Sequence, residues 1–475
     1  MRMTSVVKGV FFAAALVGMA SAVAADKKIV TYEGDVKSIL RAHCFKCHGE
    51  DEKKNGLNLS TYNELMKGGS NGEAVKAGRP NSSLLYQAVA REGDDVAPMP
   101  PKSPKIPDAD IATIKSWIEQ GVVEVEGGKS KAPAFRSLEF KATNTVAGGP
   151  VPMPENLPTL NLPKLAHANA VTALAASPRA PLLAVAGQER IVLYDTAKRA
   201  TIGVLPFTEG IPYVLRFSRN GTVLLAAGGR GVKVGKAVLY DVKSGARLAE
   251  FGDETDVVLA ADISPDQKLV AIGGPTKIVK VFSTKDGKLV YKILKHTDWV
   301  TALEFSPDGQ KLATGDRNGS AFLWEAETGG VLYALSEHKD GINAMSWRAD
   351  SEVLATGGED GQLVVWDAKE GWPVNQATPH TPKPRGTSLA KLPNGVLSVM
   401  FASDGNLYST GRDNALRAWK SGGGKIGAYE TVAGTLTRLT VSADGKSVYA
   451  GDLYGNVWVW DAPTGTKVEP LVATK

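Results

Sequence analysis

The stretch HTDWVTALEFSPDGQKLATGDRNGSAFLWE, residues 296–325, contains the pattern that decides the fold of most of this chain. A short apolar segment, 301–305, leads into the turn Ser306-Pro307-Asp308-Gly309, and a second segment, 311–315, follows the turn. A third segment ends at Trp324-Glu325. Pro, Asp and Gly favour tight turns, and apolar segments of this length between turns are typical of β-strands. The stretch therefore predicts three consecutive short strands.

The same pattern recurs along residues 166–475. In each repeat the third segment ends in an aromatic residue followed by an acidic residue or a substitute for it: Tyr194-Asp195, Tyr240-Asp241, Phe282-Ser283, Trp324-Glu325, Trp366-Asp367, Trp419-Lys420 and Trp460-Asp461. Successive aromatic residues are 46, 42, 42, 42, 53 and 41 positions apart. A period near forty residues with four short strands per unit is the mark of a propeller blade, so the sequence predicts an all-β ring of seven blades.

These repeats resemble the WD-repeat family over about two-thirds of the chain, and the match is best in the fourth and fifth repeats. The resemblance implies that a histidine and an aspartate in each of these two repeats hold the blade together through hydrogen bonds: His296 with Asp316, and His338 with Asp360. The other repeats are expected to lack this histidine, which leaves His167 and His380 without an assigned role. A basic, Pro-rich insert at 381–395 is expected to form a projecting loop.

Upstream of the repeats, Cys44-Phe45-Lys46-Cys47-His48 contains the only two cysteines of the 475 residues. Cys-x-x-Cys-His is the attachment signature of a c-type haem, in which two thiols bond to the porphyrin and the histidine is the proximal iron ligand. A redox Cys-x-x-Cys pair would be expected in a βαβ context. A structural zinc would need a second pair of ligands, and His43 and His48 flank the cysteines too tightly to supply it. The sequence therefore predicts one covalently bound haem c, held by Cys44, Cys47 and His48.

The residues around this motif predict a small all-α domain at 26–126. Apolar side chains recur at helical spacing in three segments, 35–42, 82–90 and 111–118. The first of these segments ends just before the cysteine motif. A short amphipathic segment at 62–67 contains Met66, which is expected to be a core side chain.

The sixth iron ligand is predicted to be Met99. No histidine occurs between His48 and His167, and Met99 lies in Pro98-Met99-Pro100-Pro101-Lys102. Flanking prolines restrict the backbone, so they would present the thioether with little residual freedom. A His/Met ligand pair raises the redox potential and fills the coordination sphere, which suits electron transfer better than oxygen or peroxide chemistry.

This region resembles the planctomycete-type cytochrome c domain over roughly a fifth of the chain. The residues that carry the resemblance are Cys44 to Gly49, Gly56-Leu57-Asn58-Leu59, Gly68-Gly69, Gly78-Arg79-Pro80, Ser82-Ser83-Leu84-Leu85, Met99-Pro100-Pro101-Lys102, and Trp117-Ile118 with Gly121. The resemblance implies haem binding by Cys44, Cys47 and His48 with Met99 as the partner ligand. Pro98 is a departure, because the family tends to have a basic residue there.

Four further residues of this domain have expected roles. His43 is expected at the surface or beside the metal ligands, and His48 is expected to donate its other ring N–H to a backbone carbonyl. Arg79 and Arg91 are candidates to pair with haem propionates, with ordinary solvated charges as the alternative.

Residues 1–25 predict a signal peptide and export to the periplasm. Arg2 and Lys8 precede an apolar run at 9–19, and small residues at 22–25 suit cleavage. An uncleaved N-terminal anchor is the alternative, and no later run approaches transmembrane length. Residues 127–165, rich in Gly and Pro, predict a semi-rigid linker. The formal net charge of +5 gives no indication of nucleic-acid binding.

Three functions fit this organisation. The first is an exported monohaem cytochrome that transfers single electrons while the propeller docks a redox partner or a neighbouring enzyme. The second is an enzyme with its active site in the propeller channel, supplied with electrons by the haem domain. The third is an interaction module in which the haem is a sensor. The sequence contains no catalytic constellation, which favours the electron carrier over the enzyme.

Overall fold

The computed structural model describes residues 29–78, 80, 83–92, 96–128, 151–155, 157, 169–380, 395–420 and 424–471. The chain divides into two compact units, 1–133 and 134–475. The predicted signal peptide, most of the predicted linker and the insert at 381–394 lie outside the described residues. His167 and Arg79 lie outside them too.

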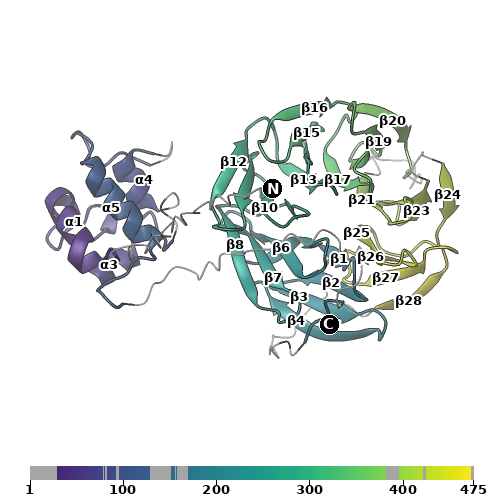
Figure 1. Ribbon diagram of the computed structural model, residues 1–475, viewed down its shortest axis with the longest axis horizontal. Helices are drawn as coiled ribbons and strands as arrows, with labels where there is room; N and C mark the ends of the chain where they lie inside the picture. The colour runs from purple at the N-terminus through teal and green to yellow at the C-terminus, as the bar shows by residue number, and fades with distance from the viewer. Residues whose placement is uncertain are drawn as a thin grey trace, which may run out of the picture. The chain divides into compact units, whose positions relative to one another are not determined.

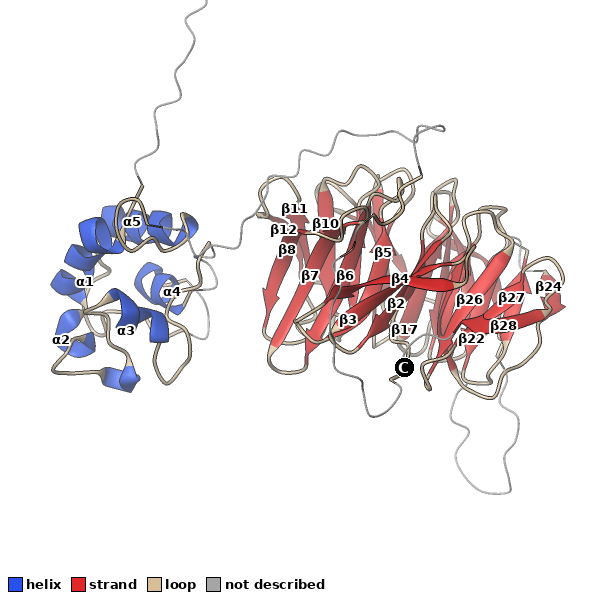
Figure 2. Ribbon diagram, turned by 90° about the horizontal axis from the view of Figure 1, so that it is seen from below, coloured by secondary structure: helices blue, strands red, loops and turns tan. Residues whose placement is uncertain are grey.

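The N-terminal unit is helical, as predicted, and its helices are short (Figure 2). A π-helical turn opens the unit and continues directly into the first α-helix. In chain order the elements are η1 (Tyr32–Val36), α1 (Lys37–His43), α2 (Phe45–His48), the 3₁₀ turn η2 (Lys54–Gly56), α3 (Tyr62–Lys67), α4 (Leu84–Ala90) and α5 (Asp108–Glu119). The segments expected at 35–42, 82–90 and 111–118 correspond to α1 with its preceding turn, α4 and α5.

Three aromatic side chains organise the core of this unit. Trp117 of α5 is fully buried, and its indole N–H donates to the carbonyl of Val123 at 2.9 Å. The ring of Tyr32 lies 6.1 Å from Trp117 and 5.7 Å from Tyr62, and its hydroxyl donates to the carbonyl of Leu59 at 2.8 Å. The indole N–H of Trp117 and the hydroxyls of Tyr32 and Tyr62 each donate to a backbone carbonyl. The three rings therefore bury apolar surface without leaving a hydrogen-bond donor unpaired.

The glycine pair that follows α3 is required by the backbone. Gly68 has φ 77° and ψ −158°, a conformation that is open almost only to glycine. A Cβ on Gly68 would lie 2.1 Å from the carbonyl oxygen of Gly72. The Gly68-Gly69 sequence therefore ends α3 and returns the chain toward Asn55, whose carbonyl accepts the N–H of Ser70 at 2.8 Å.

The second unit is a ring of seven antiparallel sheets (Figure 1), each made of four strands that are consecutive in the chain. The predicted seven-bladed propeller is confirmed. Its strands are β1 (Leu174–Ala176), β2 (Leu182–Gly187), β3 (Arg190–Asp195), β4 (Ala200–Pro206), β5 (Ile211–Phe217), β6 (Val223–Arg230), β7 (Val234–Asp241), β8 (Arg247–Glu254), β9 (Ala260–Ile263), β10 (Leu269–Gly273), β11 (Val279–Ser283), β12 (Leu289–Ile293), β13 (Val300–Phe305), β14 (Lys311–Asp316), β15 (Ala321–Glu325), β16 (Val331–Leu335), β17 (Ile342–Trp347), β18 (Val353–Gly358), β19 (Leu363–Asp367), β20 (Trp372–Ala377), β21 (Val396–Phe401), β22 (Leu407–Gly411), β23 (Leu416–Trp419), β24 (Lys425–Ala428), β25 (Leu436–Val441), β26 (Ser447–Asp452), β27 (Val457–Asp461) and β28 (Lys467–Leu471).

The ring closes where the seventh sheet packs against the first. The backbone N–H of Val171 donates to the carbonyl of Asp452 at 2.9 Å, and that of Ala176 donates to the Thr440 hydroxyl at 3.0 Å. Leu183 and Val185 of the first sheet share one buried cluster with side chains of β26, β27 and β28. Each of these two sheets consists of four consecutive strands of its own. The ring is therefore closed by contacts between the two sheets and not by a strand that they share.

No helix among the described residues is long and apolar enough to cross a membrane.

Candidate functional site

The Cys-x-x-Cys-His motif folds into one helical turn that continues from α1. The N–H of Cys44 donates to the carbonyl of Leu40 at 2.8 Å, which seats the turn on the end of α1. The N–H groups of Cys47 and His48 donate to the carbonyl of Cys44 at 3.1 and 2.9 Å. A two-residue spacing within a helical turn brings both thiols and the imidazole into one short segment, α2 and its N-cap.

Backbone contacts hold the residues that follow this turn. A Cβ on Gly49 would lie 2.4 Å from the carbonyl oxygen of Phe45, so only glycine fits there. The N–H of Gly49 donates to the carbonyl of Glu52 at 2.9 Å, and that of Leu59 donates to the carbonyl of His48 at 2.8 Å. Hydrogen bonds therefore hold the backbone of His48 at both its N–H and its carbonyl, the first to Cys44 and the second from Leu59.

Cys44 packs against the core of the domain along with several apolar side chains. Phe45, Leu57 and Met66 are partly buried and pack against the core of the domain together with Cys44. The expectation that Met66 is a core side chain agrees with this packing. Burial raises the pKa of the Cys44 thiol to about 11, so the free thiol is protonated at neutral pH.

The imidazole of His48 has an unpaired nitrogen. Its Nδ1 is buried and has no hydrogen-bond partner in the part of the chain that the structure describes. The expected bond from the ring to a backbone carbonyl is not formed at Nδ1. The carbonyls of this turn accept backbone N–H groups instead, that of Cys44 from Cys47 and His48, and that of His48 from Leu59. A buried polar atom without a partner costs about 1–3 kcal/mol, and a bound metal ion is one explanation for it. The residues present thus fit a c-type haem.

Met99 lies on a different segment from the cysteine motif. It is half-buried in the loop after α4, and its backbone N–H donates to the carbonyl of Ala88 in α4 at 2.9 Å. The loop backbone is therefore anchored to α4, which holds the methionine in place by a hydrogen bond as well as by the flanking prolines. The role of Met99 as distal ligand stays a prediction.

Two further residues of the N-terminal unit have protein partners. His43 at the end of α1 lies 3.3 Å from the carboxylate of Asp110, so it connects α1 to the first turn of α5. Both side chains are about 30 % exposed, as expected for a surface histidine. Arg91 is exposed and donates to the carbonyl of Ser103.

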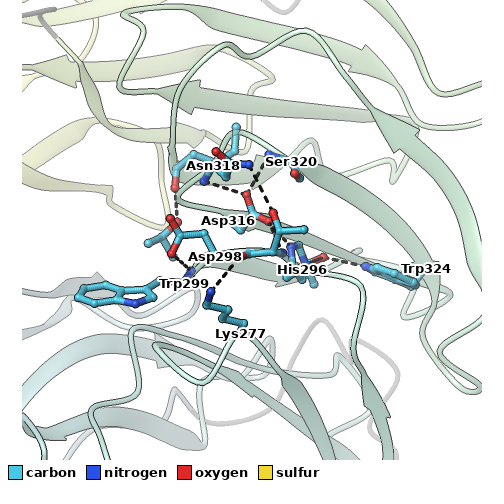
Figure 3. A network of polar contacts seen from close by, with 12 residues as sticks. Lys277, His296, Asp298, Trp299, Asp316, Asn318, Ser320 and Trp324 are labelled. Atoms are coloured by element: carbon cyan, nitrogen blue, oxygen red, sulfur yellow. Dashed lines mark hydrogen bonds and ion pairs between the residues drawn. The ribbon is translucent and has the colours of Figure 1, made fainter.

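The histidines expected to be structural are confirmed in that role. His296 Nδ1 lies 3.0 Å from the Asp316 carboxylate, and its Nε2 lies 2.8 Å from the hydroxyl of Thr314. The indole of Trp324 donates to the same hydroxyl at 2.7 Å, as Figure 3 shows. The fifth sheet repeats this network with His338, Asp360, Thr356 and Trp366 at 2.8–3.2 Å.

His380 completes a third network of the same kind, which corrects the expectation that other repeats lack the histidine. Its Nδ1 lies 2.7 Å from Asp413, and its Nε2 lies 3.1 Å from the Ser409 hydroxyl, which accepts from the Trp419 indole at 3.0 Å. His380 is 33 positions before its aspartate, whereas His296 is 20 positions before Asp316. The insert at 381–395 accounts for the longer separation and hid the pattern in the sequence.

These networks predict that the propeller loses stability in mild acid. Burial lowers the pKa of both His296 and His380 below the ordinary value of 6.5. Below pH 6.5 the unfolded chain therefore binds protons that the folded chain does not, and the free energy of unfolding falls as the pH falls. We expect a lower urea midpoint by tryptophan fluorescence at pH 5.5 than at pH 7.5. An equal or higher midpoint at pH 5.5 would contradict the assignment of neutral, buried imidazoles.

Comparison with known families agrees with both units. Residues 44–103 match the family model described as Planctomycete cytochrome C. Residues 261–347 match the model of the WD40 domain of anaphase-promoting complex subunit 4, and residues 329–367 match the WD domain, G-beta repeat. A search of curated proteins finds no match to the chain. The chain therefore joins a cytochrome c domain of the planctomycete type to a seven-bladed WD40 β-propeller.

Proposed function

We propose that this protein is an exported monohaem cytochrome that transfers single electrons and uses its propeller to dock a redox partner. The observation that carries the proposal is the α2 turn, where two thiols and a histidine with a buried, unpaired ring nitrogen occupy five consecutive residues. The family match over residues 44–103 supports the same chemistry.

The residues of the haem domain have distinct roles in this proposal. Cys44 and Cys47 would tether the cofactor, and His48 would hold its iron. Met99 would supply a thioether as a second ligand to the iron. When bound, haem c supplies a metal centre that is oxidised and reduced by one electron.

The propeller supplies a rigid platform in the same proposal. Buried side chains fill the interfaces between its sheets, and WD40 propellers commonly mediate protein interactions. The networks of His296 and His338 fix turns that connect neighbouring sheets, so these two turns have a defined geometry. Such a surface suits recognition of a protein partner, because little ordering entropy is lost on binding.

The proposal is tested by the cofactor content and redox behaviour of the purified full-length protein. We expect one haem per chain and a single reversible wave that fits a one-electron transfer. A second chromophore or a bound metal would favour an enzyme in the propeller channel instead. Ready binding of carbon monoxide by the wild-type ferrous protein would favour a sensor, because it requires an open iron site.

Replacing Met99 with alanine is expected to open the iron site. The Met99→Ala protein should bind carbon monoxide in the ferrous state, and its potential should fall by on the order of 0.1 V, a fraction of the range of about 0.8 V that axial ligands span. Met66→Leu is the matched control, because Met66 packs against the core and should leave both readouts unchanged. A Met99→Ala protein with wild-type potential and no carbon monoxide binding would show that another group occupies the distal position.

A further inference from the structure

The innermost strands of all seven sheets surround a cavity of about 90 Å³. Figure 1 shows these strands facing the middle of the ring. The cavity is lined mainly by small and apolar side chains, but two arginines, Arg216 of β5 and Arg438 of β25, also line it. The two arginines differ in whether a carboxylate of the protein balances their positive charge.

Arg216 has carboxylate partners. Its guanidinium lies 3.1 Å from the carboxylate of Glu304 in β13, and Asp262 of β9 lies close enough to interact with it. Asp262 in turn accepts the backbone N–H of Phe305 at 2.8 Å. The charge of Arg216 is therefore balanced within the protein.

Arg438 has no carboxylate partner in the part of the chain that the structure describes. Its Nη1 donates to two backbone carbonyls, those of Leu397 and Thr437, both at 3.2 Å. Burial lowers the pKa of Arg438, and the charge of Arg216 lowers it further. Of the two cations that line the cavity, Arg438 is therefore the one without a carboxylate partner among the described residues.

The other six inner strands leave room for this side chain. Arg438 pairs with Gly451 on the neighbouring strand β26. At the equivalent register position Ala302 pairs with Gly315 and Ala344 pairs with Gly357. The remaining equivalent residues are small too: Ala173, Val214, Ala260 and Ser398. At this register position Arg438 is therefore the one long side chain, and the six equivalent positions carry alanine, valine or serine.

We propose that this cavity binds a small oxyanion on Arg438. A guanidinium presents a planar set of donors that matches two oxygens of one anion, and a poorly solvated cation without a partner favours such a ligand. One water molecule needs about 10–15 Å³ of cavity space, so a cavity of about 90 Å³ has room for several water molecules or a small anion. That size suits inorganic sulfate, phosphate or a carboxylate of one or two carbons. The site is independent of the haem domain and adds to the function proposed above.

The test is calorimetric titration of the full-length protein with sodium sulfate, sodium phosphate and sodium acetate, each at constant ionic strength. We expect saturable binding of at least one anion to the wild-type protein, and the three titrations distinguish sulfate, phosphate and carboxylate as the preferred class. Arg438→Gln should weaken that binding at least tenfold. Arg348→Gln removes the same charge from an exposed turn and should leave the affinity within twofold.

A second variant keeps the test decisive if Arg438→Gln does not fold. Arg438→Lys retains the charge but loses the planar donor pair, so it should bind with reduced affinity. The proposal is wrong if wild-type protein shows no saturable heat with any of the three anions, or if both Arg438 variants bind as the wild type does.

Discussion

Replacing Cys44 and Cys47 together with serine is expected to abolish covalent haem attachment completely. The two residues are the only thiols of the chain, and a hydroxyl at either position cannot form the thioether. Denatured Cys44→Ser/Cys47→Ser protein should therefore give no haem-dependent peroxidase stain, whereas denatured wild-type protein should stain. Each single variant retains one thiol and should stain weakly.

The control for this pair lies inside the same turn. Lys46 is exposed between the two cysteines, and its side chain makes none of the contacts that seat the turn on α1. Lys46→Ser should therefore keep the stain at the wild-type level. Retention of haem by the denatured double variant would show that the cofactor is bound through other residues, and the proposed function would lose its main support.

Replacing Asp316 with alanine is expected to lower the free energy of unfolding of the propeller by about 3–5 kcal/mol, because several hydrogen-bond donors lose their acceptor at about 1–3 kcal/mol for each one that stays buried. The Asp316 side chain is 0 % exposed and lies 3.0 Å from His296 Nδ1. It also accepts the backbone N–H groups of Thr297, Asn318 and Ser320 at 2.9–3.3 Å (Figure 3). Alanine leaves all four groups without this acceptor, and the cost is largest for the fully buried imidazole of His296.

The matched control for this variant is Asp308, in the turn between β13 and β14 of the same sheet. Its exposed carboxylate accepts from the Ser306 hydroxyl and from the N–H of Gln310. Asp308→Ala should cost only about 0.5–1.5 kcal/mol, because water replaces the lost acceptor. Urea unfolding followed by tryptophan fluorescence compares the two. Equal losses would mean that the buried network contributes no more than an exposed turn does.

The propeller was predictable from the sequence because the residues that define each blade lie close together in the chain and recur in every blade. Turn residues such as Pro307-Asp308-Gly309 and aromatic residues such as Trp324 recur at nearly constant spacing, and each fixes one strand end. The network of His380 was not predictable in the same way. Its partners, Asp413 and Ser409, come after an insert, so the fixed spacing on which the prediction depended is lost there.

The haem site was predictable to a different degree at each residue. Cys44, Cys47 and His48 form a contiguous motif whose chemistry requires that spacing. Met99 is more than fifty positions away, so its position relative to the motif depends on the path of the loop that contains it. The backbone hydrogen bond from Met99 to Ala88 helps to set that path, and no sequence pattern predicts this bond. The unpaired nitrogen of His48 was missed because ring orientation depends on packing, which a motif does not encode.

The central claim is tested most directly by the mass of the peptide that carries residues 44–48, isolated from protein recovered from the periplasm. The account predicts that this peptide is heavier than its sequence by the mass of one haem, and that the protein begins near residue 26. An unmodified peptide with two free thiols, from protein recovered in its native compartment, would contradict it.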